Sequence, residues 1–235
     1  MTNYAAHKER AAARSRKMSR SARDIGRLPP IVDPDRRRHG LSSFKHWNET
    51  YMSAKFSLAW GDFHLEAMPL MERCTREGGL YAYAMPRGSG KTTLAESLAL
   101  YSIFSGFRSY VFLIGSTEDS ALARVKSLKL ELTVNDLLAA DFPEICYPIR
   151  KLENEARRCA GQLHHGQPTH IEWLANQIVL PCIPGSNASA AIIRACGLTG
   201  HLRGALQNRP DGTSRRPDYV ILGIKSKPRP RGSGR

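Results

Sequence analysis

The nine residues Met85-Pro86-Arg87-Gly88-Ser89-Gly90-Lys91-Thr92-Thr93 constrain the fold of this 235-residue chain more than any other segment. Small residues let consecutive backbone N–H groups turn toward anionic oxygens. As in a phosphate-binding loop, Lys91 supplies a cation for terminal phosphates and Thr92 supplies a hydroxyl for Mg²⁺. The general pattern of such loops has Gly where Met85 stands. The segment therefore indicates a nucleotide phosphate site if a strand precedes it and a helix follows it.

Strand-like and helical patterns alternate around this segment. The apolar run 80–84 lies directly before it, and apolar residues at helical spacing follow over 94–101. The next apolar run, 110–114, is typical of a buried parallel strand, and the following helical pattern begins at Thr117. This order favours an α/β fold with a parallel sheet. Further helices are expected after Ser42 or Ser43 and after Asp62, and further strands at 170–175 and 178–183 (a hairpin), 190–195 and 219–222.

The positive charge lies at the two ends of the chain. The formal net charge is +14, yet residues 41–202 hold 15 basic and 15 acidic residues. Residues 1–40 hold 11 and 4, and residues 203–235 hold 9 and 2. Such ends are typical of arms that contact phosphate backbones or acidic surfaces, although a soluble, disordered tail has the same composition. We therefore expect a basic, disordered arm over 1–40, a globular domain over 41–222 and a basic, disordered tail over 223–235.

Composition argues against several classes of protein. Apolar residues make up 41% of the chain, which is enough for a core. No apolar run approaches the ~18 residues of a membrane span, and the first residues lack the apolar segment of a secretory signal. A mitochondrial transit peptide is the competing interpretation, against which Glu9 and Asp24 argue. The five cysteines are odd in number and form no C-x-x-C, which favours a reduced, cytoplasmic chain.

The loop and its flanks resemble the large subunit of phage terminases, the motors that package DNA. The loop itself carries this resemblance, because Arg87 stands inside it in the form Pro-Arg-Gly-Ser-Gly-Lys-Thr-Thr. The resemblance covers about residues 20–222. Stretches similar to one phage and prophage terminase group are Ala-Arg-Asp-Ile-Gly-Arg-Leu-Pro-Pro at 22–30, Trp60 with His64, Phe-Pro-Glu at 142–144 and Leu-Thr-Gly-His-Leu-Arg-Gly at 198–204.

The resemblance implies a P-loop NTPase of the ASCE type, in which ATP and Mg²⁺ power the translocation of double-stranded DNA into a procapsid. Lys91 and Arg87 would act on the γ-phosphate, and Thr92 would hold Mg²⁺. Trp60 and His64 would meet the adenine, and Arg203 would couple nucleotide state to motion. The implied partners are DNA, the terminase small subunit and the portal in the host cytoplasm, with homo-oligomers only of the full-length form. The nucleotide-binding set is Pro86, Arg87, Gly88, Ser89, Gly90, Lys91, Thr92 and Thr93.

The acids that this family uses for hydrolysis are missing. In the family, two carboxylates follow the strand that corresponds to 219–222, where they hold the metal and orient water. Here Gly223 follows Leu222, and no Asp or Glu occurs after Asp218, which precedes the strand. The strands that would neighbour the phosphate-loop strand, and the nuclease domain, are also missing. We therefore expect a terminase ATPase region truncated at the Walker B strand, with an incomplete sheet, weak ATP binding and negligible turnover.

Other interpretations stay open. A non-catalytic nucleotide- or DNA-binding protein that interacts with packaging subunits has the same motifs, and the missing acid favours it. A metabolite kinase would need a lid and an acceptor site, for which we find no pattern. Zinc binding by Cys159, His164, His165 and His170 lacks the spacing of a structural site. Aromatic residues over 47–60 are expected in the core rather than stacked on bases, with Trp60 as the exception.

Overall fold

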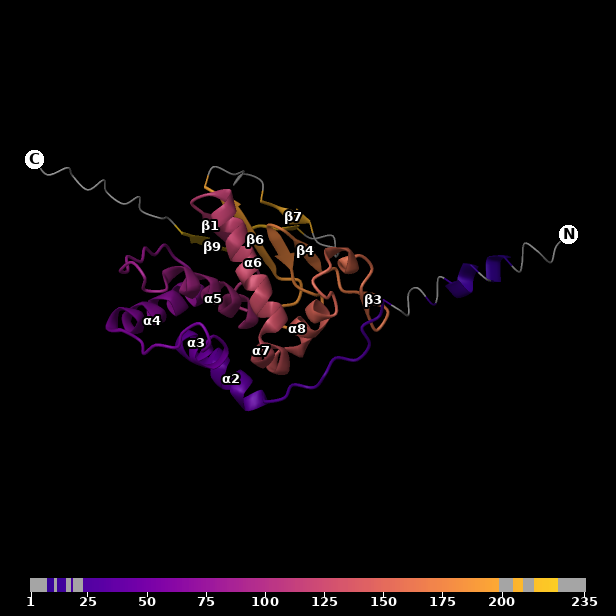
Figure 1. Ribbon diagram of the computed structural model, residues 1–235, viewed down its shortest axis with the longest axis horizontal. Helices are drawn as coiled ribbons and strands as arrows, with labels where there is room; N and C mark the ends of the chain where they lie inside the picture. The colour runs from indigo at the N-terminus through magenta and orange to yellow at the C-terminus, as the bar shows by residue number, and fades with distance from the viewer. Residues whose placement is uncertain are drawn as a thin grey trace, which may run out of the picture.

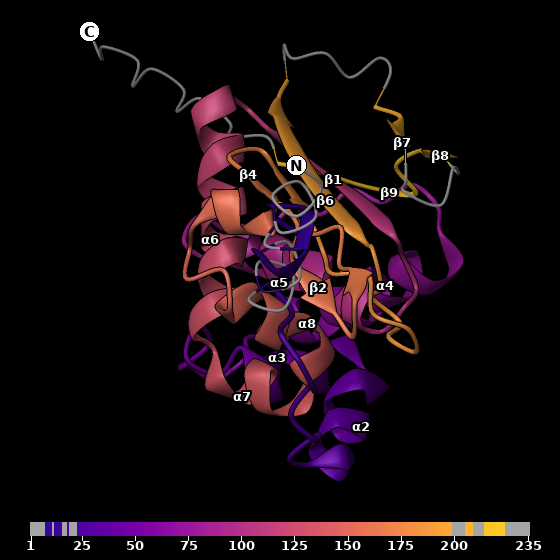
Figure 2. The ribbon, with the colours of Figure 1, turned by 90° about the vertical axis from the view of Figure 1, so that its right-hand side faces the viewer.

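A computed structural model describes residues 8–10, 12–15, 18, 23–198, 205–208 and 214–223. One five-stranded sheet, in the order β4-β5-β6-β1-β9, forms a layer with most of the helices on one side of it (Figures 1 and 2). The three strands β6, β1 and β9 are parallel, whereas β4 and β5 are antiparallel to their neighbours. The fold is therefore α/β with a mixed sheet. The strands are β4 (Glu172–Leu174), β5 (Gln177–Val179), β6 (Ile192–Gly197), β1 (Tyr110–Gly115) and β9 (Tyr219–Leu222).

The central strand β1 is buried along its whole length. Val111 and Leu113 join the main core between the sheet and the helices, and Tyr110 and Phe112 join a smaller core on the other face. This two-sided burial explains the continuous apolar run in the sequence. The predicted strands at 110–114 and 219–222 are confirmed, and they pair in parallel with Leu113 opposite Ile221.

Seven helices of the described chain surround this core. Three of them begin where the sequence predicted: Ser43 and Thr117 accept a hydrogen bond from a backbone N–H as N-caps, and another helix begins at Asp62. The aromatic residues Trp47 and Tyr51 are buried, which confirms their expected place in the core. The helices are α2 (Pro34–Ser42), α3 (Phe44–Tyr51), α4 (Asp62–Glu77), α5 (Lys91–Phe104), α6 (Glu118–Val134), α7 (Asp136–Asp141) and α8 (Pro143–Arg150).

A buried polar network fixes α3 against α5. The Trp47 indole Nε1–H donates to Ser97 Oγ at 3.2 Å, and the Ser97 hydroxyl donates to Asn48 Oδ1 at 2.5 Å. The Asn48 amide in turn donates to the carbonyl of Phe44. Because these groups pair within the core, the network sets how α3 and α5 pack.

The predicted boundary of the N-terminal arm at residue 40 is wrong. Residues 34–42 form α2, which is capped by Asp33 and packs on α3 and α7. Before it, Asp24 pairs with Leu163 in a parallel bridge, and the Asp24 carboxylate accepts from the backbone N–H groups of Gly26 and Gly166. The reason is tertiary contact, which a local charge count does not include. Most of residues 1–22 lie outside the described part of the chain.

The predicted strand at 80–84 is also wrong. Residues 78–86 belong to no sheet, although Tyr81 and Tyr83 are half-buried while Leu80, Ala82 and Ala84 are exposed. The side chains therefore alternate as in a strand, but no described backbone pairs with the segment, and a strand needs that ladder. The edge strand β9 likewise has β1 as its one neighbour among the described strands.

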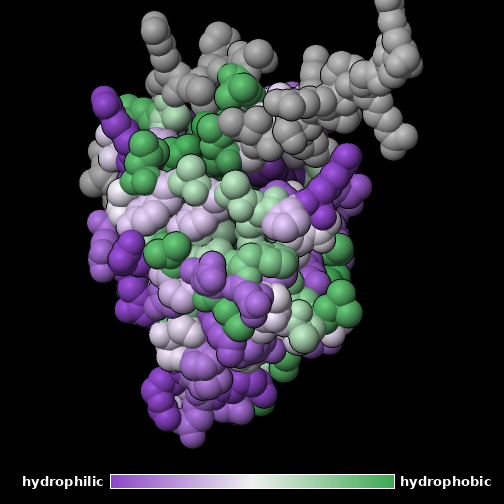
Figure 3. Space-filling view, turned by 90° about the vertical axis from the view of Figure 1, so that its left-hand side faces the viewer, coloured by the Kyte–Doolittle hydropathy of each residue, from purple (hydrophilic) through white to green (hydrophobic). Residues whose placement is uncertain are grey.

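Figure 3, viewed from the left-hand side of Figure 1, shows apolar surface gathered in the upper half of the molecule.

The later part of the chain follows the prediction in outline. The hairpin is confirmed as β4 and β5, with shorter strands than expected, and the predicted strand at 190–195 is confirmed as β6. Arg203 and residues 224–235 of the predicted tail lie outside the described residues. No helix in the described ranges is long and apolar enough to span a membrane. Elements that the sequence did not predict include α7, α8, η1 (Ala156–Cys159), β2 (Leu163–His164), β3 (Gln167–Pro168), β7 (Gln207–Asn208) and β8 (Ser214–Arg215).

Candidate phosphate-binding loop at the start of helix α5

The loop before α5 takes a conformation that depends on its two glycines. Gly88 and Gly90 have φ of +85° and +75°, a region that L-residues with a side chain rarely adopt. Gly90 is the N-cap of α5, which begins at Lys91. The first N–H groups of a helix have no partner within the helix, and the helix dipole adds positive potential there. The loop therefore ends in a place where an anion is favoured.

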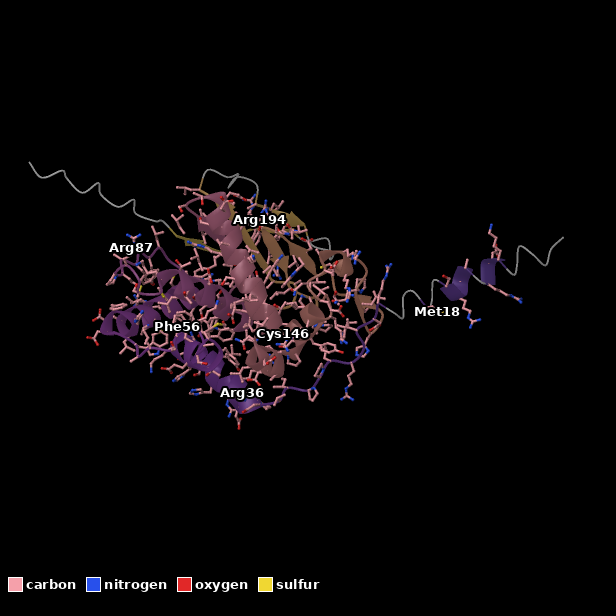
Figure 4. All side chains as sticks on the ribbon, in the orientation of Figure 1. Met18, Arg36, Phe56, Arg87, Cys146 and Arg194 are labelled. Atoms are coloured by element: carbon pink, nitrogen blue, oxygen red, sulfur yellow. The ribbon has the colours of Figure 1, made fainter. Side chains whose placement is uncertain are left out.

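The Lys91 side chain folds back over the loop. Its ammonium donates to the carbonyl oxygens of Met85 at 2.7 Å and Pro86 at 2.5 Å, and the residue is exposed. Arg87 is also exposed and lies at the rim of the molecule in Figure 4. Thr92, in the first turn of α5, is exposed as well. Two cations and a hydroxyl thus surround the loop without burial, and an arriving anion can replace the carbonyls that Lys91 now contacts.

His64 contacts the loop, and Trp60 packs on His64. His64 Nδ1 accepts from the Gly61 N–H at 3.2 Å, which leaves Nε2 to donate to the carbonyl of Ser89 at 2.8 Å. The Trp60 ring contacts His64 edge to face at 5.5 Å and also packs on Phe56 at 4.9 Å. Phe56 in turn lies 3.8 Å from where a Cβ on Gly90 would stand. These aromatic side chains support the loop, and Phe56, which the sequence assigned to the core, is partly buried and packs against it.

The carboxyl end of β9 carries no acid. Asp218 lies at the opposite end, where its carboxylate accepts from the backbone N–H groups of Ser109 and Tyr110 and so fixes the start of β1. Gly223 stands directly after β9. At the end of β6, the Glu118 carboxylate is already engaged by the N–H of Gly197 at 2.7 Å. The described residues therefore place no group of His, Cys, Asp or Glu side chains that would complete a Mg²⁺ site with the Thr92 hydroxyl.

A buried ionic cluster lies between α5 and α6. Glu96 is 8% exposed, accepts from the Ser127 hydroxyl at 2.7 Å and lies 3.9 Å from the Lys55 ammonium. Burial raises the pKa of Glu96 above its usual value despite these partners. Arg124 is 9% exposed, and burial lowers its pKa although the charge of Glu96 opposes this. Within the described residues, Arg124 Nη1 has no hydrogen-bond partner. No sequence pattern singles out this arginine.

The remaining candidate residues do not converge on the loop. His164 and His165 contact each other edge to face, and no group of three or more His, Cys, Asp or Glu side chains in the described chain is placed to hold a metal ion. Two surface hollows, of about 520 and 680 Å³, lie elsewhere. The first is lined by Arg23, Lys151, Arg157 and Arg158 among others, and the second by Cys159, His170 and Cys182 among others.

No protein-family model, curated protein or solved structure matches this chain. The terminase resemblance therefore rests on the sequence motifs alone.

Proposed function

We propose that this chain is a P-loop ATPase region of the terminase large-subunit type, which binds ATP through residues 86–93. The observation that carries the proposal is the pair of left-handed glycines, Gly88 and Gly90, directly before the N-terminus of α5. In that family the bound nucleotide powers the movement of double-stranded DNA into a procapsid in the host cytoplasm. Here the chain supplies binding groups, but Gly223 and Ile224 stand directly after β9 where the family has its two acids. The proposed activity is therefore nucleotide binding without appreciable hydrolysis.

The roles of the loop residues follow from their positions. Backbone N–H groups of the loop and of the first turn of α5 would donate to phosphate oxygens. Lys91 would exchange the carbonyls of Met85 and Pro86 for the terminal phosphates, and Arg87 would reach the same anion from the rim. Trp60 and His64 would flank the base, since both lie beside the loop. Bound ATP would supply the phosphoanhydride bond, and no carboxylate follows β9 among the described residues to activate water against it.

The test is a calorimetric titration of the purified chain with ATP. We expect Lys91→Ala to weaken binding by about tenfold or more, because a charge-assisted contact to phosphate is lost. Lys126→Ala is the matched control, since Lys126 is an exposed lysine on α6. Equal affinities of the two variants would refute the phosphate site. ATP turnover that Lys91→Ala abolishes would refute the part of the proposal that excludes hydrolysis.

A second candidate function is non-catalytic DNA binding, together with docking on other packaging subunits. The observation that favours it is the hollow lined by Arg23, Lys151, Arg157 and Arg158. Arg158 and Arg157 are partly neutralised by Glu153 and Glu155, whereas Lys151 lies over the Tyr147 ring. Duplex binding at this surface should fall steeply with salt.

The experiment for this second candidate compares duplex affinity at several salt concentrations. We expect Arg23→Ala with Lys151→Ala to weaken binding uniformly across sequences and to reduce the salt slope by about two, because two phosphate contacts are lost. Salt-independent binding, or an unchanged slope in the double variant, would exclude this surface.

A further inference from the structure

We infer that Arg124 takes the place of the metal ion at this site, so that the chain binds a nucleoside triphosphate without a divalent cation. The inference rests on the proposed function and concerns the same loop. The loop is suited to a phosphate group, and the side chain beside it is a second anion-binding group rather than a ligand for Mg²⁺. The residue responsible for that difference is Arg124.

Arg124 occupies the space that a side chain at position 223 would take. A Cβ built on Gly223 would overlap the Arg124 guanidinium, so the two groups are in direct contact at the carboxyl end of β9. Gly223 is held there by its N–H, which donates to the carbonyl of Ile114. A carboxylate at 223 would therefore meet this guanidinium. Instead the described chain leaves Arg124 Nη1 buried without a partner.

The position of Glu96 places Arg124 beside the start of α5. Thr92 and Glu96 are four residues apart, so they share one face of α5 and are separated by about 6 Å along its axis. Glu96 faces α6, because it accepts from Ser127 of that helix and interacts with the charge of Arg124. Thr92 consequently lies on the side of α5 that faces the guanidinium. Arg124 and the first turn of α5 thus border the same end of the sheet.

The chemistry of this corner favours phosphate oxygens. A buried guanidinium with an unpaired donor is destabilising, and a bound anion relieves that cost. Arginine can donate two parallel hydrogen bonds to a phosphate, and it keeps its charge under all ordinary conditions. A Mg²⁺ ion at the same place would be repelled by the guanidinium, and the Glu96 carboxylate, one turn along α5 from Thr92, is already engaged by Ser127 and Lys55. The positive charge that a triphosphate needs is therefore supplied by the chain itself.

The decisive experiment measures ATP affinity of the unaltered chain in excess Mg²⁺ and in excess EDTA. We expect the two dissociation constants to agree within about threefold, which is a small difference on the scale of binding free energies. In EDTA, Arg124→Met should weaken ATP binding by about tenfold or more. Arg124→Lys should weaken it less, because lysine keeps the positive charge. Arg150→Met is the matched control, since Arg150 Nε also lacks a partner in the described chain but lies on α8.

A gain-of-function variant tests the same idea from the other side. Gly223→Asp should pair with Arg124 and make ATP binding depend on Mg²⁺. The outcomes separate the two proposals. Affinity that is absent in both conditions would overturn the phosphate site and this inference together. Affinity that needs Mg²⁺ in the unaltered chain, or that is insensitive to Arg124→Met in EDTA, would overturn the role of Arg124 and leave the loop as a metal-dependent site.

Discussion

The guanidinium of Arg36 forms a bidentate ion pair with the carboxylate of Asp141, with both N···O distances at 2.7 Å. Asp141 is 0% exposed and also accepts a hydrogen bond from the Tyr51 hydroxyl at 2.9 Å. Burial, together with this carboxylate, raises the pKa of Tyr51 well above its usual range. One buried charge on α7 thus joins that helix to α2 and α3, which lie far earlier in the sequence.

Removing the arginine from this pair should be strongly destabilising. Arg36→Met leaves Asp141 buried with the Tyr51 hydroxyl in place of its cation, and breaking such a pair costs about 3–5 kcal/mol in free energy of unfolding. Urea denaturation measures this loss. Arg38→Met is the control, because Arg38 forms an exposed pair with Asp35 that contributes about 1 kcal/mol or less. Equal effects of the two substitutions would show that the buried pair contributes no more than the exposed one.

The same pair explains why the arm could not be delimited from sequence. Locally, 36–38 is a run of three arginines that indicates a solvated segment. Its partners lie more than a hundred residues away: Arg36 contacts Asp141, while Arg37 contacts Glu144 and the face of the Phe142 ring. The order of α2 comes from these contacts and not from an apolar face, since Gly40 is its one buried residue.

In the candidate site too, some residues can be predicted from their neighbours in the sequence and others act through contacts with distant residues. The loop could be predicted because Gly88, Gly90 and Lys91 act through the backbone within a few residues of each other. Arg124 could not, because its significance depends on contact with Gly223, ninety-nine positions later. The segment 80–84 shows the converse: Tyr81 and Tyr83 alternate as in a strand, but alternation reports burial and says nothing of whether a neighbouring backbone is present.

Substituting the first loop glycine should weaken nucleotide binding without loss of the fold. Gly88 has φ of +85° and open space around its Cβ position, so Gly88→Ala introduces backbone strain and no clash. That strain costs about 1 kcal/mol. If the loop leaves its binding conformation to relieve the strain, the affinity for ATP should fall about fivefold. Calorimetry with ATP measures it. Gly185→Ala has the same backbone demand and the same open space away from the loop, so its ATP affinity should be unchanged.

The polar network between α3 and α5 should be sensitive to a single hydroxyl. Ser97→Ala removes the acceptor of the Trp47 indole N–H and the donor to Asn48, both of which are buried. Unpaired buried polar groups cost about 1–3 kcal/mol, so the midpoint of urea unfolding should fall. Ser42→Ala, which removes an exposed hydroxyl bonded to the His39 carbonyl, should change stability by much less. A small effect at Ser97 would indicate that water satisfies the network.

Glu96 should make stability depend on pH in a direction opposite to that of most carboxylates. Because burial raises its pKa above the ordinary value of 4.5, the folded chain holds this proton more tightly than the unfolded chain does. The contribution of the protonated Glu96 carboxyl to the free energy of unfolding is present below pH 4.5, and it is lost as the pH rises through the pKa of Glu96 in the folded chain. Glu96→Gln should therefore be more stable than the unaltered chain at pH 7, and the difference should shrink as the pH approaches 4.5. Urea unfolding at both pH values measures this, with Glu66→Gln on the exposed side of α4 as the control. A variant that is less stable at pH 7 would mean that the contacts of Glu96 with Lys55 and Ser127 outweigh its burial.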